Sequence, residues 1–195
     1  MPTRMRKQIH RYAITGGIGA GKSHVCQLLG KRGIAVYDCD EAAQRLMSSD
    51  IALQDALSCL VGSSIYQNGR LRKDILANFL LKGAPHKQAV NEIVHPAVAL
   101  DFLKSGFQWL ESAILFDSGF YQRVTFDRTI CVSAPLEIRI KRIMERDFIT
   151  EEHARQWIES QMSQDEIEKR TDFVIINDGK ANLETQIDKL LSCLH

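Results

Sequence analysis

Short runs of apolar and β-branched residues alternate with segments of helical periodicity along most of the chain. The runs predict five strands, at residues 9–15, 34–37, 107–110, 129–132 and 173–176. The segments between them carry apolar residues three or four positions apart, which is the spacing of one helix face. Because strands separated by helices pair in parallel, the pattern predicts an α/β fold: a five-stranded parallel sheet flanked by helices.

Two longer helical stretches interrupt this alternation. Between the fourth and fifth strands, one helix begins after Pro135 and a second, with Thr150 as its N-cap, extends to residue 162. Between the second and third strands, residues 51–102 are expected to be almost wholly helical and to contain no strand. Breaks in this stretch are expected near Gly62, at Asn68-Gly69, at 83–85 and at His95-Pro96. A last amphipathic helix covers residues 183–194.

Composition and charge narrow the class of protein. A chain of 195 residues, 45% of them hydrophobic, can build one domain with a sizeable core. Lysine and arginine number 25 against 24 acidic residues, so no overall field attracts nucleic acid or an anionic membrane. No apolar run reaches the roughly 20 residues of a membrane span, and the first residues do not resemble a signal peptide. We expect a soluble, cytoplasmic protein whose five scattered cysteines are reduced.

Residues 16–23 satisfy the pattern GxxxxGK[ST] between a predicted strand and a predicted helix. In that setting backbone N–H groups cradle a polyphosphate at the start of the helix, which an ordinary glycine-rich turn would not do. Lys22 is expected on the β- and γ-phosphates and the Ser23 hydroxyl on Mg²⁺, so ATP and Mg²⁺ are the expected cofactors. The expected ATP-binding residues of this loop are Gly17, Ile18, Gly19, Ala20, Gly21, Lys22 and Ser23.

Carboxylates follow two of the predicted strands. If the second strand stays extended through Cys39, Asp38 and Asp40 point to the same side and face one site. A carboxylate there could accept the proton of an attacking hydroxyl or hold Mg²⁺. The alternative is that one of them caps the helix beginning at Glu41. Glu111 ends the third strand and either reaches Mg²⁺ through water or is a solvated strand terminus.

Three arginines, Arg139, Arg142 and Arg146, recur on one stripe of the helix after Pro135. Guanidinium groups are bidentate donors for phosphates, so this helix suits a lid over the phosphate loop. The alternative is a solvated face paired with nearby glutamates.

Two further polar residues have open roles. Arg70 is either a surface charge or a ligand for an anionic substrate. An isolated histidine such as His95 is more often structural than catalytic.

Together these motifs resemble the dephospho-CoA kinase family over nearly the whole chain. The residues that carry the resemblance are Thr15 to Ser23, Asp38-Cys39-Asp40, Gly69-Arg70-Leu71-Arg72, His95-Pro96, Leu115-Phe116-Asp117, Arg142, Arg146, Gln161 and Asp172 to Asn177. The resemblance implies a P-loop fold like that of nucleoside monophosphate kinases, as one domain over residues 1–195. Its core would be 1–49, 106–134 and 171–195, with a helical substrate-binding insertion at 50–105 and a lid at 135–170.

The resemblance also implies the activity: ATP-dependent phosphorylation of the ribose 3′-hydroxyl of dephospho-CoA. Asp40 would be the base and Asp38 its magnesium-side neighbour, although which aspartate does which stays open. Lys22, Arg142 and Arg146 would be catalytic, and Asn177 would contact ATP. Substrate binding would involve Asp38, Asp40, Arg70, His95 and Phe116, and Ser23 would hold Mg²⁺ with Asp38 or Glu111. The expected partners are ATP and dephospho-CoA, without nucleic acid, membrane or an obligate protein.

Two departures from the family pattern concern the lid and the substrate wall. Arg139 stands where a glutamine is common, so we expect its replacement by alanine to be milder than that of the other two arginines. Residues 113–115 are Ala-Ile-Leu, where the family usually has a proline before paired leucines.

Two other functions are also compatible with a phosphate-binding loop. One is a kinase of nucleosides or nucleotides, which the helical insertion and the motifs at Gly69 to Arg72 and His95-Pro96 disfavour. The other is a GTP-hydrolysing switch, but no Asn-Lys-x-Asp sequence occurs, and residues 177–180 have these residue types in the wrong order.

Overall fold

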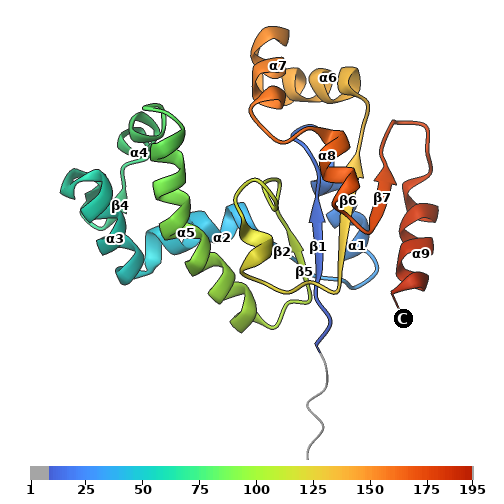
Figure 1. Ribbon diagram of the computed structural model, residues 1–195, viewed down its shortest axis with the longest axis horizontal. Helices are drawn as coiled ribbons and strands as arrows, with labels where there is room; N and C mark the ends of the chain where they lie inside the picture. Colours follow the sequence, from blue (N-terminus) through green and yellow to red (C-terminus); the bar gives the residue numbers. More distant parts are fainter. Residues whose placement is uncertain (1–8, 195) are drawn as a thin grey trace, which may run out of the picture. The chain divides into compact units, whose positions relative to one another are not determined.

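The computed structural model describes residues 9–194 and contains a five-stranded sheet with helices on its faces (Figure 1). The strands are β1 (Tyr12–Thr15), β2 (Val36–Asp38), β5 (Trp109–Glu111), β6 (Arg128–Ser133) and β7 (Phe173–Ile176), in the order β2-β5-β1-β6-β7. Strand β1 pairs in parallel with both β5 and β6, and β6 pairs in parallel with β7. The predicted α/β fold class is therefore confirmed.

The contacts divide the chain into two compact units. The sheet unit comprises Met1–Val36, Phe107–Ala113 and Thr125–His195, and the helical unit comprises Tyr37–Gly106 and Ile114–Val124. The expected division into core, insertion and lid concerns function and stays a prediction.

The core of the sheet unit lies between the sheet and the helices α1 (Lys22–Gly30) and α9 (Leu183–Cys193). All four residues of β1 are buried, as expected of a central parallel strand. Helix α1 buries Val25, Leu28 and Leu29, which recur at helical spacing on one face. Helix α9 contributes Ile187 and Leu190 to the same cluster.

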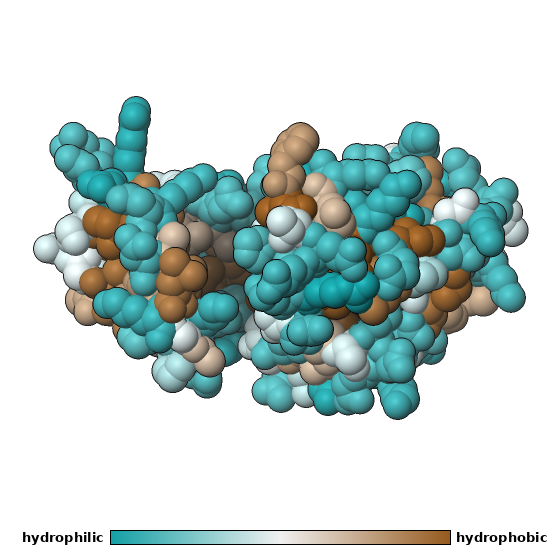
Figure 2. Space-filling model, turned by 90° about the horizontal axis from the view of Figure 1, so that it is seen from above, coloured by the Kyte–Doolittle hydropathy of each residue, from teal (hydrophilic) through white to brown (hydrophobic). Residues whose placement is uncertain are grey.

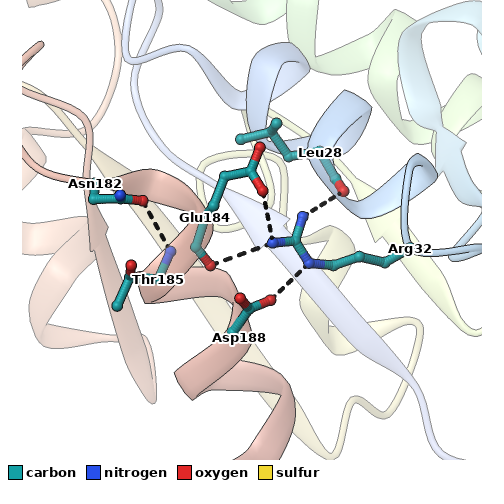
Figure 3. A network of polar contacts seen from close by, with 6 residues as sticks. All are labelled: Leu28, Arg32, Asn182, Glu184, Thr185 and Asp188. Atoms are coloured by element: carbon teal, nitrogen blue, oxygen red, sulfur yellow. Dashed lines mark hydrogen bonds and ion pairs between the residues drawn. The ribbon is translucent and has the colours of Figure 1, made fainter.

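An arginine just after α1 holds this helix to α9 (Figure 3). Arg32 donates through Nε to Asp188 at 2.8 Å and through a terminal nitrogen to the Glu184 carboxylate at 3.2 Å. It also donates to the Leu28 carbonyl oxygen at 3.0 Å. Helix α9 begins at an Asn182 cap, whose side chain accepts from the Thr185 N–H. The contacts fix α9 beside the helix that follows the glycine-rich loop.

Three short helices follow β6: α6 (Leu136–Asp147), α7 (Glu151–Glu159) and α8 (Gln164–Lys169). Thr150 caps α7 by accepting from the His153 N–H, as predicted. The helix predicted to extend to residue 162 instead ends at Glu159. Ser163 then caps α8, which the sequence pattern did not predict as a separate helix. Ile140, Ile143 and Ala154 join α6 and α7 in a small apolar cluster.

The helical unit contains α2 (Cys39–Ser49), α3 (Ile51–Val61), α4 (Lys73–Leu80) and α5 (Ala84–Ser105), with short 3-10 turns at Ser63–Ile65 and Phe120–Gln122. The expectation that residues 51–102 hold no strand was wrong. Strands β3 (Tyr66–Gln67) and β4 (Arg70–Leu71) form an antiparallel hairpin. Asn68 and Gly69 both have positive φ angles, of 51° and 72°, as the tight turn of a hairpin requires.

The expected break at His95-Pro96 was also wrong, because α5 runs through it without interruption. Proline removes one backbone donor, which disfavours a helix interior. Here Val90, Val94 and Val98 recur every fourth residue and are all buried, and Phe102 continues the stripe one turn later. Burial of this apolar face on both sides of the proline outweighs the lost hydrogen bond.

Hydrophilic side chains dominate the surface that Figure 2 shows, interrupted by small groups of hydrophobic residues. None of the helices in residues 9–194 has the length and apolar character needed to cross a membrane. All five cysteines are thiols, as expected, and Cys39 and Cys131 are buried.

Candidate functional site

Residues 16–21 form a loop that connects β1 to α1, and its shape depends on glycine. Gly16 has a φ of 140°, and a Cβ there would overlap the carbonyl oxygen of Val132 on β6. Gly21 is the N-cap of α1, with a φ of 93°, and a Cβ there would overlap the side-chain amide of Asn177. Neighbouring elements therefore approach the loop backbone more closely than any side chain would allow.

The carbonyl oxygens of this loop are hydrogen-bonded to protein groups. The Gly16 oxygen accepts from Lys22 Nζ at 2.9 Å, and the Ile18 oxygen accepts from Arg139 Nε at 2.9 Å. Within residues 9–194, the N–H groups of Gly19, Gly21 and Ser23 have no protein acceptor. A loop with bound carbonyls and available amides at a helix N-terminus is suited to an anion.

Lys22 and Glu111 form a largely buried ion pair beside the loop. Their side chains are only 10% and 12% exposed, and Lys22 Nζ lies 3.8 Å from Glu111 Oε1. Glu111 is the last residue of β5, and β5 pairs with β1, which leads into the loop. Parallel pairing thus brings the predicted strand-end carboxylate beside the loop lysine. Ser23, in the first turn of α1, is exposed.

The three arginines of α6 have different surroundings, and their expected role in a lid stays a prediction. Arg142 donates to the Ala20 carbonyl oxygen at 3.2 Å and to the Asn177 carbonyl oxygen at 3.1 Å. Arg139 is buried and contacts the loop at the Ile18 carbonyl oxygen. Only Arg146 is solvent-exposed, and it pairs with the adjacent Asp147 at 2.7 Å.

Asn177 and Gln161 hold the loop from the side of β7 and α8. Asn177, one residue beyond β7, is buried and donates through Nδ2 to the Ala20 carbonyl oxygen at 2.8 Å. Its own N–H donates to the Ser133 carbonyl oxygen at the end of β6. Gln161 Oε1 accepts from the Ile18 N–H at 2.9 Å. Gln161 was noted only as part of the family resemblance, and its contact with the loop could not be predicted, because its partner lies 143 positions away.

In the helical unit, Asp38 and Asp40 do not share an extended segment, which corrects the period-two geometry expected from the sequence. Strand β2 ends at Asp38, and Asp40 lies in the first turn of α2. Asp38 is the N-cap, accepting from the N–H groups of Asp40 and Glu41. The capping alternative therefore holds for Asp38, and Asp40 is an exposed helical residue.

The remaining expected substrate residues also belong to the helical unit. Arg70 is exposed on β4. His95 is partly buried on α5, 6.1 Å from the Phe120 ring centroid, and burial lowers the pKa of its imidazole. The Phe116 ring packs edge-on against Tyr121 at 5.3 Å.

The expected residues therefore fall into two groups. The structure brings the loop, Glu111, Arg142 and Asn177 together within the sheet unit. Asp38, Asp40, Arg70, His95 and Phe116 are carried by the helical unit.

A phosphate loop between the central strand and its following helix, in a parallel sheet of this order, defines the class of P-loop kinases. The family model for dephospho-CoA kinase matches residues 11–182. A dephospho-CoA kinase of Bacteroides fragilis (strain YCH46) is 40% identical over 95% of this chain and 93% of its own length. This chain belongs to the dephospho-CoA kinase family.

Solved structures share the fold of this chain. The crystal structure of TT1252 from Thermus thermophilus has a TM-score of 0.76 at 31% identity, covering 96% of this chain and 97% of that chain. A dephospho-CoA kinase from Campylobacter jejuni shares the fold, with a TM-score of 0.65 at 22% identity over 93% of this chain and 95% of its own.

Proposed function

We propose that this chain transfers the γ-phosphoryl group of ATP to the ribose 3′-hydroxyl of dephospho-CoA, giving CoA and ADP in the last step of CoA biosynthesis. The observation that carries the proposal is the loop at residues 16–23, with its carbonyls bound and its amides available, in a chain of the dephospho-CoA kinase family. Within the chain we assign the core to 1–49, 106–134 and 171–195, the substrate insertion to 50–105 and the lid to 135–170.

The sheet unit would bind ATP, the phosphoryl donor. Amides of the loop would hold the β- and γ-phosphates, with Lys22 adding charge where negative charge collects during transfer. Lys22 is bound to the Gly16 carbonyl oxygen, so its ammonium group is already positioned before a nucleotide arrives. Arg142 and Asn177 would contact ATP from the side of β7, because both hold the loop at Ala20.

The helical unit would bind the acceptor. The oxygen of the ribose 3′-hydroxyl would bond to the γ-phosphorus as the bond from that phosphorus to ADP breaks. Asp40 would accept the proton that this hydroxyl loses. Asp38 is engaged in capping α2, which favours Asp40 as the base and Asp38 as its positioning neighbour. Arg70, His95 and Phe116 would contact the dephospho-CoA, and Arg146 would approach the transferring group from the lid.

The donor set near the loop fits Mg²⁺. The Ser23 hydroxyl and the Glu111 carboxylate, both in the sheet unit, are hard oxygen ligands of the kind this ion prefers. Asp38, in the helical unit, stays the alternative carboxylate that the family resemblance implies. When bound, Mg²⁺ would neutralise charge on the β- and γ-phosphates.

A substrate panel tests the proposal. ADP release is coupled to NADH oxidation with ATP or GTP as donor and with dephospho-CoA, nucleosides or nucleoside monophosphates as acceptor. We expect ATP and dephospho-CoA to give the highest kcat/KM. Faster transfer to a nucleoside or nucleotide would favour the rival kinase function, and GTP hydrolysis without transfer would favour a switch.

A further inference from the structure

A buried arginine packs directly against the phosphate loop. Arg139 is 4% exposed, and its Nε donates to the Ile18 carbonyl oxygen at 2.9 Å. Its guanidinium packs so closely on Gly17 that a Cβ at position 17 would overlap it. The positive charge is therefore fixed against the loop backbone at Gly17 and Ile18.

Arg139 differs from Arg146 and Arg155 in having no acidic partner among residues 9–194. Arg146 pairs with Asp147, and Arg155 pairs with Glu137 and Glu151. Within residues 9–194, no carboxylate oxygen lies within 4 Å of the Arg139 guanidinium, and burial lowers the pKa of this group. A buried charge without a counter-ion is costly to the fold. Binding of an anion close by would offset that cost.

Both backbone polar groups of Ile18, the residue that Arg139 contacts, are hydrogen-bonded to side chains. The Ile18 N–H donates to Gln161 Oε1, and the Ile18 carbonyl oxygen accepts from Arg139. Both side chains line a cavity of about 690 Å³ at the ends of β6 and β7, which Arg155 also lines. The contact fixes the arginine relative to the loop, so its charge needs no rearrangement when a ligand binds.

We propose that Arg139 is a positioning residue for phosphate binding: it fixes the Ile18 peptide and supplies a buried positive charge whose counter-ion is the polyphosphate of a nucleoside di- or triphosphate on the loop. The inference rests on the proposed function, because it takes the loop to be the ATP site. It gives Arg139 a role of its own in phosphate binding, whereas the family pattern predicted only that its replacement by alanine would be milder than that of Arg142 or Arg146.

Three variants separate charge from shape. Arg139→Gln removes the charge, and Arg139→Lys keeps the charge but loses the planar donor group. Arg155→Gln is the matched control, because it removes the same charge from the same cavity without touching the loop. The dissociation constant of Mg-ADP is measured by calorimetry, and the melting temperature of the ligand-free protein is measured in parallel.

We expect Arg139→Gln to weaken Mg-ADP binding about tenfold and Arg139→Lys by about threefold or less. Arg155→Gln should bind Mg-ADP like the wild type. The ligand-free melting temperature of Arg139→Gln should not fall, since a buried unpaired charge has been removed.

Binding by Arg139→Gln within twofold of the wild type overturns the inference. The inference is also overturned if Arg139→Gln and Arg139→Lys weaken Mg-ADP binding equally and both lower the melting temperature of the ligand-free protein. That result would indicate a purely structural role. Wild-type protein that binds Mg-ADP but does not phosphorylate dephospho-CoA rejects the proposed function and leaves this inference standing. Wild-type protein that binds no nucleotide overturns both.

Discussion

Asp38 caps the helix that carries Asp40: its Oδ1 accepts the backbone N–H of Asp40 at 2.8 Å. The same oxygen accepts the Glu41 N–H at 2.9 Å. One carboxylate is thus committed to the start of α2, and the other lies in its first turn. The two aspartates, which a strand would have made equivalent, have different structural roles, and this difference makes them separable by mutation.

Replacing Asp40 by asparagine keeps the shape of the side chain but removes its charge and basicity, so turnover should collapse while Mg-ATP affinity stays nearly intact. Asp38→Asn should keep the helix cap and weaken the response to Mg²⁺ more, whereas Asp38→Ala should lower the free energy of unfolding by about 1 kcal/mol. Turnover, magnesium titration and urea unfolding check these outcomes. Near-normal turnover of Asp40→Asn would reject its role as the base.

Lys22→Ala should abolish phosphoryl transfer and leave the fold intact. Lys22 contacts the Gly16 carbonyl oxygen and Glu111 at the edge of the loop, and the apolar core does not include it. Circular dichroism separates loss of activity from unfolding. Lys31→Ala, on the exposed end of α1, is the matched control and should be silent. Turnover near the wild-type rate in Lys22→Ala would reject the assignment of the loop.

Arg142 and Arg146 should give different kinetic signatures. Arg142→Ala removes donors to Ala20 and Asn177, so ATP affinity and turnover should both fall. Arg146→Ala breaks only an exposed pair with Asp147, so turnover should fall with ATP affinity changed by about twofold or less. Unchanged turnover of Arg146→Ala would make it a solvated surface residue.

His95 predicts a pH dependence of stability. Burial lowers its pKa below the usual 6.5, so the unfolded chain binds a proton that the folded chain does not. The free energy of unfolding should therefore decrease as the pH falls through 6.5 toward the lowered pKa, and this contribution should be fully present above pH 6.5. Urea unfolding of the wild type and His95→Gln at several pH values gives the difference. Parallel curves for the two proteins would contradict the prediction.

The sequence predicted those features that a local pattern determines. The phosphate loop is a continuous motif with a strand before it and a helix after it. Thr150 is the N-cap of the helix that begins at the next residue. The hairpin at Asn68-Gly69 had a usable signal, because this dipeptide is typical of tight hairpin turns. Its strands have only two residues each, too few for an alternating pattern to be visible.

Features that depend on distant partners could not be predicted from the sequence. Arg139 and Gln161 reach Ile18 across 121 and 143 positions, and neither belongs to the loop motif. Helix α5 continues through Pro96 because of packing on both sides of it, which a local rule for proline does not include. Strand periodicity predicted that Asp38 and Asp40 face one site, which requires an extended chain through Cys39. The strand instead ends at Asp38, whose side chain caps the following helix.

The position of the transferred phosphoryl group tests the central claim most directly. Purified protein is incubated with dephospho-CoA, Mg²⁺ and γ-¹⁸O-labelled ATP, and the product is analysed by mass spectrometry and ³¹P NMR. The account predicts a single labelled product, CoA, with the phosphate on the ribose 3′-oxygen, and no such product with Lys22→Ala. Label found only in inorganic phosphate, or on another hydroxyl, would contradict it.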